Sequence, residues 1–242
     1  MSLTIPPLPP SWPFAPRALE STWHRQEGVD LDGLGDGWTL TLPQGLDIPS
    51  GTTALEGAFG RGGVQRRGDI VLRPYRRGGL VRFFVHSTYA SPRRFEREWI
   101  IHRALWAAGF PTVEPLGYGF RRQGLGFEGV YLSAFTEGKA WPADWSAGET
   151  RMVELWTALR ALGAWGLWAP DLNATNVLLG PDGLRLLDWD RAAFVPASDL
   201  LPLYHRRLLR SLARLAAPAP SVQRFQAGMQ EPGSLGRSAG QG

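Results

Sequence analysis

The stretch "DLNATNVLLGPDGLRLLDWD", residues 171–190, decides how this chain folds. Two short apolar runs, "NVLLG" and "LRLLDWD", flank the turn sequence "GPDG", which predicts two antiparallel strands. Asp171 and Asn176 stand five positions apart at the start of this stretch, and Asp188 ends the second run. Because the turn brings the second strand back beside the first, we expect Asp188 to lie next to Asn176.

These three side chains have a chemistry in common. Carboxylate and amide oxygens are hard ligands suited to a Mg²⁺ ion that also holds substrate phosphates. Asn176 and Asp188 are therefore the predicted metal ligands, and Asp171 is left to accept a proton from a hydroxyl group. The alternative is that Asp171 and Asn176 only cap a turn. The order of the three, with the intervening strands, is instead the catalytic-loop and metal-loop pattern of protein-kinase-like enzymes, which predicts ATP and Mg²⁺ as cofactors.

Composition limits the possible classes of protein. A length of 242 residues suits one compact domain or two small lobes sharing a cleft, and a hydrophobic fraction of 43% is enough for a core. The chain has no cysteine, which excludes disulfides and thiolate metal sites. We expect neither a signal peptide nor a membrane-spanning helix, because the start of the chain lacks a charged and then apolar leader and no run of eighteen apolar residues occurs.

The hydrophobic pattern predicts an α+β fold in which a small β-rich lobe precedes a helical lobe, an order that resembles the compact bilobal fold of protein-kinase-like enzymes. A Pro/Gly-rich N-terminal extension is expected over 1–45, a β-rich N-lobe over 46–135, a helical C-lobe with the catalytic loop over 136–217 and a disordered tail over 218–242. Helices are expected over residues 91–110, 146–166 and 198–216. In the second helix, Ser146 is the predicted N-cap and Glu149 completes a capping box.

The predicted N-lobe contains further parts of a nucleotide site. Arg73 lies on the strand "DIVLRPY", where a kinase carries its phosphate-pairing lysine, and Glu98 in the following helix is placed to pair with it, with Glu96 as its rival. Each of these charges taken alone could be an ordinary solvated side chain. A glycine turn, "FGRGG", precedes them, and its backbone N–H groups could approach phosphates. The residues expected to bind nucleotide through this turn are Gly60, Arg61 and Gly62.

Several motifs together resemble the bacterial lipopolysaccharide core kinases, and the 3-deoxy-D-manno-octulosonic acid (Kdo) kinases in particular. They are "GRGG", "VLRPYRRGGLV", "RRFEREWIIHRALWAAGFPTVEPLG", "DLNATNVLL", "LLDWDRA" and "LLRSLARL", which lie in order between about residues 55 and 216. The resemblance implies transfer of the ATP γ-phosphate to a sugar hydroxyl of Kdo in lipid A–core. It implies Asp171 as base, Asn176 and Asp188 as metal ligands, Arg73 on nucleotide phosphates and Glu98 orienting Arg73.

The chain departs from the family pattern at two positions. Family members usually carry a histidine two residues before the catalytic aspartate, where it braces the loop, and this chain has Ala169 there. Arg73 stands where kinases at large use lysine. Two other functions therefore remain open: a small-molecule phosphotransferase of the aminoglycoside-kinase type, and a pseudokinase that binds nucleotide without transfer, for which Ala169 is the best argument.

The distribution of arginines suggests how the protein binds its acceptor. Basic patches would attract an anionic glycolipid acceptor, Kdo–lipid A, and hold the protein peripherally on the cytoplasmic face of the bacterial inner membrane. The alternative is that the arginines of the last helix form its solvated face. Nucleic acid is not expected as a partner, because the sequence has no recognisable binding module for it. The arginines concerned are Arg61, Arg66, Arg67, Arg76, Arg77 and Arg82 in the first lobe and Arg206, Arg207, Arg210 and Arg214 in the last helix.

Overall fold

The computed structural model describes residues 3–19, 22–54, 63–75, 88–196 and 199–230. The chain divides into two compact units. We call residues 17–107 and 113–137 the sheet unit, and residues 2–16, 108–112 and 138–242 the helical unit. A sheet followed by helices confirms the predicted α+β class and is the element order expected of a protein-kinase-like fold. Among the described residues, no helix is both long enough and apolar enough to cross a bilayer.

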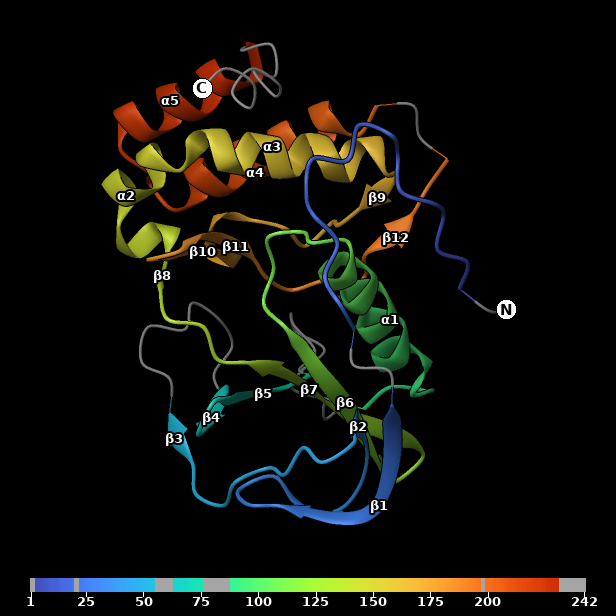
Figure 1. The fold of residues 1–242 in the computed structure, drawn as a ribbon. Coiled ribbons are helices and arrows are strands. Elements are labelled where there is room, and N and C mark those ends of the chain that lie inside the picture. The colour runs from blue at the N-terminus through green and yellow to red at the C-terminus, as the bar shows by residue number, and fades with distance from the viewer. Residues whose placement is uncertain (1–2, 20–21, 55–62, 76–87, 197–198, 231–242) are drawn as a thin grey trace, which may run out of the picture. The chain divides into compact units, whose positions relative to one another are not determined.

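Among its described residues, the sheet unit has seven antiparallel strands in the order β1-β2-β6-β7-β5-β4-β3 (Figure 1). Its middle strands β6 and β7 form a long hairpin, and β5 pairs with β7 so that Arg73 stands opposite Tyr131. The strands are β1 (Trp23–Leu31), β2 (Gly35–Pro43), β3 (Thr53–Ala54), β4 (Gln65–Arg67), β5 (Ile70–Pro74), β6 (Pro115–Gln123) and β7 (Gly126–Ala134).

Alternation along these strands sorts their side chains between two apolar clusters. On β7, Val130 and Leu132 join a core of aliphatic residues and Trp38, whereas Tyr131 between them joins an aromatic cluster. The helix α1 (Arg93–Ala107) contributes Phe95 and Trp99 to the aromatic cluster and contacts β6 and β7. This packing fixes the face of α1 that carries Glu98.

The structure places residues 23–43 in the sheet as β1 and β2, although the sequence assigned them to the N-terminal extension. Trp38, Leu40 and Leu42 are buried at alternate positions of β2, as a half-buried strand requires. Four glycines within this stretch interrupt the alternation of side chains and hide that period of two. The segment before them is also packed: Trp12 Nε1 donates to the Ala108 carbonyl at 2.6 Å within the helical unit.

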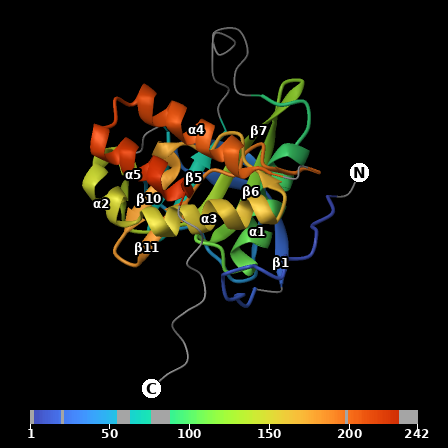
Figure 2. The same cartoon turned by 90° about the horizontal axis from the view of Figure 1, so that it is seen from above.

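In the described part of the helical unit there are four α-helices, of which α3, α4 and α5 contact one another (Figure 2). Two small sheets accompany them, one joining β8, β10 and β11 and the other joining β9 and β12. The helices are α2 (Trp145–Thr150), α3 (Met152–Ala164), α4 (Leu201–Arg214) and α5 (Ala219–Gln230). The strands are β8 (Lys139–Ala140), β9 (Leu167–Trp168), β10 (Val177–Gly180), β11 (Gly183–Leu186) and β12 (Ala193–Phe194).

The helix expected over 146–166 is two helices, α2 and α3, which meet at Arg151. Asp144, not Ser146, caps α2, because its Oδ1 accepts from the Ala147 N–H at 3.0 Å. Glu149 does not complete a capping box with Ser146; its Oε1 accepts from the Ser221 hydroxyl at 2.7 Å. The predicted capping box was wrong because a stronger carboxylate acceptor stands two residues earlier.

Residues 219–230, expected to belong to a disordered tail, form α5. The ring of Phe225 is fully buried and stacks on Trp156 of α3, with 4.9 Å between ring centroids. The Trp156 Nε1 donates to the Phe225 carbonyl at 3.0 Å. Polar composition predicted disorder here, but the buried Phe225 and the Ser221–Glu149 hydrogen bond hold the helix against its neighbours.

Candidate active site

The strand pair that follows the predicted catalytic loop is present in the helical unit. The strands β10 and β11 pair in antiparallel register from Val177 opposite Leu186 to Gly180 opposite Gly183. Beyond the register, the Leu187 N–H donates to the Asn176 carbonyl at 2.9 Å. The backbone of Asn176 is therefore joined to the residue that immediately precedes Asp188.

The loop between Asp171 and Asn176 is tied together by its own amide side chains. The Asp171 carbonyl accepts from Asn173 Nδ2 at 2.9 Å and from Asn176 Nδ2 at 3.1 Å. Asn173 Oδ1 accepts from the Thr175 N–H at 2.9 Å and so caps the 3-10 turn Ala174–Asn176. Because the nitrogen of the Asn176 amide is directed to this carbonyl, its Oδ1 is the atom suited to a cation.

The Asp171 carboxylate has both cationic and anionic side chains near it. Arg191 Nη1 is 3.6 Å and Arg207 Nη2 is 3.9 Å from its Oδ1, and 31% of the side chain is exposed. Partial burial is the main cause that raises the pKa of Asp171, and the neighbouring Asp188 and Asp190 add to the rise. The two arginines oppose it. The resulting carboxylate is a stronger base than a solvated aspartate.

Asp188 and Arg191 both adopt left-handed backbone conformations, with φ of 67° and 66°. Such conformations are uncommon for residues with a side chain, and they persist where the surroundings hold them in place. Trp189 provides that hold, because its ring is fully buried and its Nε1 donates to Thr112 Oγ1 at 3.0 Å. The Thr112 hydroxyl in turn donates to the Leu186 carbonyl at 2.8 Å. The tryptophan of "DWD" thus anchors the two aspartates beside it.

The donor set fits a Mg²⁺ ion bound partly by substrate. Mg²⁺ is commonly held by one or two side-chain oxygens together with phosphate and water oxygens. An Asn176 amide oxygen and an Asp188 carboxylate, on adjoining segments, supply that number. Within the described part of the chain, no group of three or more His, Asp or Glu residues gathers into a metal site of its own.

In the sheet unit, the ion pair expected between Arg73 and Glu98 is present, at 2.5 Å from Arg73 Nη2 to Glu98 Oε1. Glu98 is buried, and its Oε2 accepts from the Tyr75 hydroxyl. The rival Glu96 is exposed on the same helix. The Arg73 guanidinium also lies over the Tyr75 ring, 5.1 Å from its centroid. A buried carboxylate with two partners holds this guanidinium in a defined position.

His102 belongs to the same cluster and was missed by sequence reasoning. It lies one turn beyond Glu98 on α1, and its Nδ1 is 2.7 Å from the Tyr131 hydroxyl. Burial lowers its pKa to about 3, so the ring is neutral at physiological pH. The spacing of four residues from Glu98 was the available signal, because it puts both side chains on one face of the helix.

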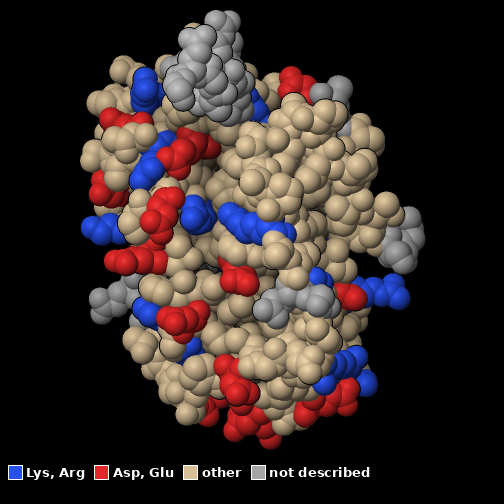
Figure 3. Space-filling model, viewed as in Figure 1, with Lys and Arg blue, Asp and Glu red and all other residues tan. Residues whose placement is uncertain are grey.

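The glycine turn expected to bind phosphates, Gly60, Arg61 and Gly62, lies outside the described residues, and its role stays a prediction. Of the first-lobe arginines expected to be exposed, Arg67 is buried and donates to the Asp32 carbonyl. Figure 3 shows acidic side chains gathered at the bottom of the view, where Figure 1 has β1 and β2. The exposed carboxylates of this hairpin include Asp30, Asp32 and Asp36.

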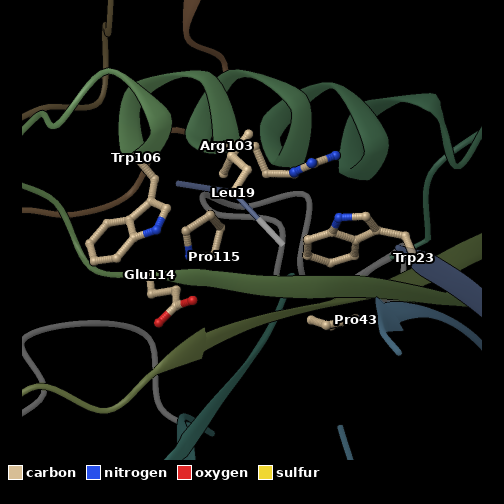
Figure 4. Close-up of a pocket in the computed structure, with 7 residues that line it drawn as sticks. All are labelled: Leu19, Trp23, Pro43, Arg103, Trp106, Glu114 and Pro115. Atoms are coloured by element: carbon tan, nitrogen blue, oxygen red, sulfur yellow. The ribbon is translucent and has the colours of Figure 1, made fainter. Parts of the chain in front are cut away.

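A small pocket in the sheet unit lies between α1 and β6 (Figure 4). It is lined by Leu19, Trp23, Pro43, Arg103, Trp106, Glu114 and Pro115. The Arg103 guanidinium stacks between rings, 4.5 Å from the Trp23 centroid and 4.7 Å from that of Trp99. None of the predicted site residues lines this pocket.

Comparison with known proteins gives similarity to one group of enzymes. The chain is 32% identical over 157 residues to proteins named 3-deoxy-D-manno-octulosonic acid kinase from Xylella fastidiosa strains M12 and 9a5c. The match covers 61% of this chain and 63% of each relative, so the chain spans less than two thirds of their length. No family model matches the chain. The resemblance to Kdo kinases seen in the sequence is confirmed.

Two solved structures are similar in fold at a lower level. A glucosamine kinase has a TM-score of 0.47 and 12% identity, over 80% of this chain and 65% of that one. The bifunctional kinase-methyltransferase WbdD has a TM-score of 0.45 and 18% identity, over 73% of this chain and 44% of that one.

Proposed function

We propose that this chain is an ATP-dependent kinase that phosphorylates a sugar hydroxyl in the Kdo region of the lipopolysaccharide inner core, with Kdo–lipid A as acceptor. One observation carries the proposal. Asp171, Asn176 and Asp188 follow one another in the order found in kinases, on a hydrogen-bonded loop and the strand pair that follows it. They do so in a chain similar to proteins named 3-deoxy-D-manno-octulosonic acid kinase.

Asp171 is the proposed base. Its carboxylate accepts the proton of the acceptor hydroxyl as the hydroxyl oxygen attacks the γ-phosphorus and the bond to the β-phosphate oxygen breaks. The raised pKa supports this role, because a base with a pKa closer to the working pH takes the proton more readily. The two bonds to the Asp171 carbonyl hold the backbone that carries the carboxylate.

Asn176 and Asp188 are the proposed Mg²⁺ ligands, through the amide Oδ1 and the carboxylate. When bound, the ion would neutralise charge on the transferring phosphate. The left-handed backbone at Asp188, fixed by the buried Trp189, supports a position held for ligation. Arg73 is proposed to contact nucleotide phosphates, with Glu98 orienting it, and Gly60, Arg61 and Gly62 are proposed to approach the same phosphates through backbone N–H groups.

An anionic acceptor is supported by the charges around the base. Arg191 and Arg207 flank the Asp171 carboxylate, and a Kdo carboxylate near the reacting hydroxyl would give these guanidinium groups a second partner. On α4, the exposed Arg206, Arg210 and Arg214 recur every four residues and form one basic row. We propose this row as the contact with an anionic membrane surface, because such a surface attracts arginines. The same surface would repel the acidic β1–β2 hairpin.

The test is transfer of the ATP γ-phosphate to Kdo–lipid A with Mg²⁺, for the wild type, Asp171→Asn and the matched Asp182→Asn. Asp182 is an exposed carboxylate in the turn of the same hairpin. We expect the wild type and Asp182→Asn to transfer phosphate and Asp171→Asn to lose about a hundredfold to ten-thousandfold in kcat. Transfer to a small amino sugar in place of Kdo–lipid A would favour the aminoglycoside-kinase type. Binding of Mg-ATP without transfer to either acceptor would identify a pseudokinase.

A further inference from the structure

We propose that α4 positions the catalytic loop, and that Tyr204, Arg207 and Ser211 are the positioning residues. The proposal rests on the function proposed above, because it assigns these side chains a role in the turnover of Asp171. The three residues follow one another at intervals of three and four positions, which places them along one face of the helix.

Four hydrogen bonds join these side chains to the backbone of residues 167–174, which runs from β9 into the catalytic loop. The Tyr204 hydroxyl donates to the Leu167 carbonyl at 2.6 Å and accepts from the Ala169 N–H at 3.1 Å. Farther along the helix, Arg207 Nε donates to the Leu172 carbonyl at 3.2 Å. The Ser211 hydroxyl accepts from the Ala174 N–H at 3.0 Å.

The contacts fall on both sides of Asp171, so α4 holds the backbone that precedes the base and the backbone that follows it. Ala169, Leu172 and Ala174 are each no more than 1% exposed, and water is not at hand to replace a lost partner there. A buried backbone group left without a partner destabilises the conformation that buries it. The loop therefore depends on α4 to keep its conformation.

This arrangement also accounts for alanine at position 169. Its side chain has no donor or acceptor, but its backbone N–H is fixed by the Tyr204 hydroxyl. The Tyr204 ring is fully buried and lies 5.0 Å from that of Trp168, which holds the hydroxyl at this point. The brace comes from α4 and does not require a side chain on the loop.

Arg207 links the brace to the charge of the base. Its Nε bonds the loop backbone, while its Nη2 lies 3.9 Å from Asp171 Oδ1. Tyr204 and Ser211 are neutral and can act only on position. A change at either of these two should therefore lower kcat without moving the pH dependence, and this distinguishes positioning from an effect on the pKa of Asp171.

The experiment compares Ser211→Ala with Ser221→Ala. Ser221 is the matched control, because it is a serine of the same unit whose hydroxyl bonds Glu149, away from the loop. We expect Ser211→Ala to lower kcat about tenfold to a hundredfold. Its KM for ATP should stay within about twofold of wild type, and the pH at which kcat falls on the acid side should not change. Ser211→Thr should restore most of the rate, and Ser221→Ala should keep it.

Hydrogen exchange supplies a readout independent of catalysis. We expect the Ala174 amide to exchange faster in Ser211→Ala, and the Ala169 amide in Tyr204→Phe, each while Leu178, which pairs with Arg185 between β10 and β11, keeps its protection. Equal kcat losses in Ser211→Ala and Ser221→Ala, or unchanged exchange at Ala174, would overturn the proposal. If Ser211→Ala does not fold, Tyr204→Phe decides by the same criteria. A wild type that transfers no phosphate would refute the proposed function, and the exchange data would still decide whether α4 holds the loop.

Discussion

At the scale of single residues, the pKa of Asp171 is set by a contest between burial and charge. Burial and two neighbouring aspartates raise it, and Arg191 and Arg207 lower it. The base must be ionised to act, so activity is lost as pH falls through this raised pKa. The acid limb of kcat should consequently lie at higher pH than a solvated aspartate would give.

Arg191→Gln should move that limb to still higher pH. Removing the cation removes an influence that lowers the pKa of Asp171, so the carboxylate takes up its proton earlier as pH falls. Arg191→Lys should keep the limb close to its wild-type position. The check is kcat measured across the acid range, with Arg185→Gln on β11 as the control. A limb that stays in place in Arg191→Gln would contradict the assignment of Asp171 as base.

His102 should make the protein less stable in mild acid. Its pKa is about 3 in the folded protein against 6.5 when unfolded, so below pH 6.5 the unfolded state binds the extra proton and the free energy of unfolding falls. From pH 6.5 to 5 the loss should be about 2 kcal/mol. Urea unfolding of wild type and His102→Gln at several pH values is the measurement. Above pH 6.5 the free energy of unfolding should vary with pH equally in the two proteins, and below pH 6.5 it should fall more steeply in the wild type. An equal fall in both proteins below pH 6.5 would show that His102 is not the cause.

Residues differed in how well the sequence predicted them. The Arg73–Glu98 pair could be predicted because a strand cation and a helix acid have a fixed order in kinases. Tyr204 and Trp189 could not, because their roles depend on partners far away in the chain. For His102 the spacing from Glu98 was a signal, but its partner Tyr131 could not be foreseen. An isolated tyrosine in a helix gives no sign that its hydroxyl will reach a loop more than thirty residues earlier.

At the scale of elements, amphipathic helices were predicted well and those stabilised by one anchor were not. The helices α1 and α4 have regular apolar faces, and the structure contains both. The helix α5 has only scattered apolar residues, and its position depends on Phe225 against Trp156. Glycines likewise interrupt the sequence of β1 and β2, so the alternation of their few buried side chains was not recognised as a strand pattern.

Gly228→Ala should test the packing of α5. Alanine favours a helix by about 1 kcal/mol over glycine, so propensity alone predicts a more stable protein. A Cβ at this position would, however, come within 2.1 Å of the Trp156 ring. We expect overpacking to prevail and the free energy of unfolding to fall by about 1–3 kcal/mol. The exposed Gln226→Ala should be nearly neutral, and stabilisation by Gly228→Ala would mean that α5 does not rest on Trp156.

At the scale of the whole molecule, the order of a sheet portion followed by a helical portion was predictable from the change in hydrophobic pattern. The way in which the chain divides between the units was not. Residues 2–16 precede the sheet unit in sequence and residues 108–112 interrupt it, yet both segments belong to the helical unit. Short segments without regular structure have no periodicity, so their membership depends on contacts alone.

Trp12→Ala should destabilise the helical unit. The Trp12 ring lies 5.1 Å from Trp165 and 6.1 Å from Phe110, and the change removes these contacts together with the bond to the Ala108 carbonyl. For a half-buried ring we expect a loss of about 2 kcal/mol in the free energy of unfolding. Leu8→Ala, at an exposed position of the same segment, is the control. Equal effects of the two changes would argue against a specific role for Trp12.

The bonds of the N-terminal segment also set an order for events during synthesis. Trp12 donates to a carbonyl 96 residues later, and the Pro6 carbonyl accepts from Trp165, 159 residues later. A ribosome adds about 5–20 residues each second, so Pro6 is made roughly 8–32 s before its partner. This segment is therefore translated well before the residues that hold it and reaches its native place late. The prolines of this segment disfavour its pairing as a strand during the interval before its partners are made.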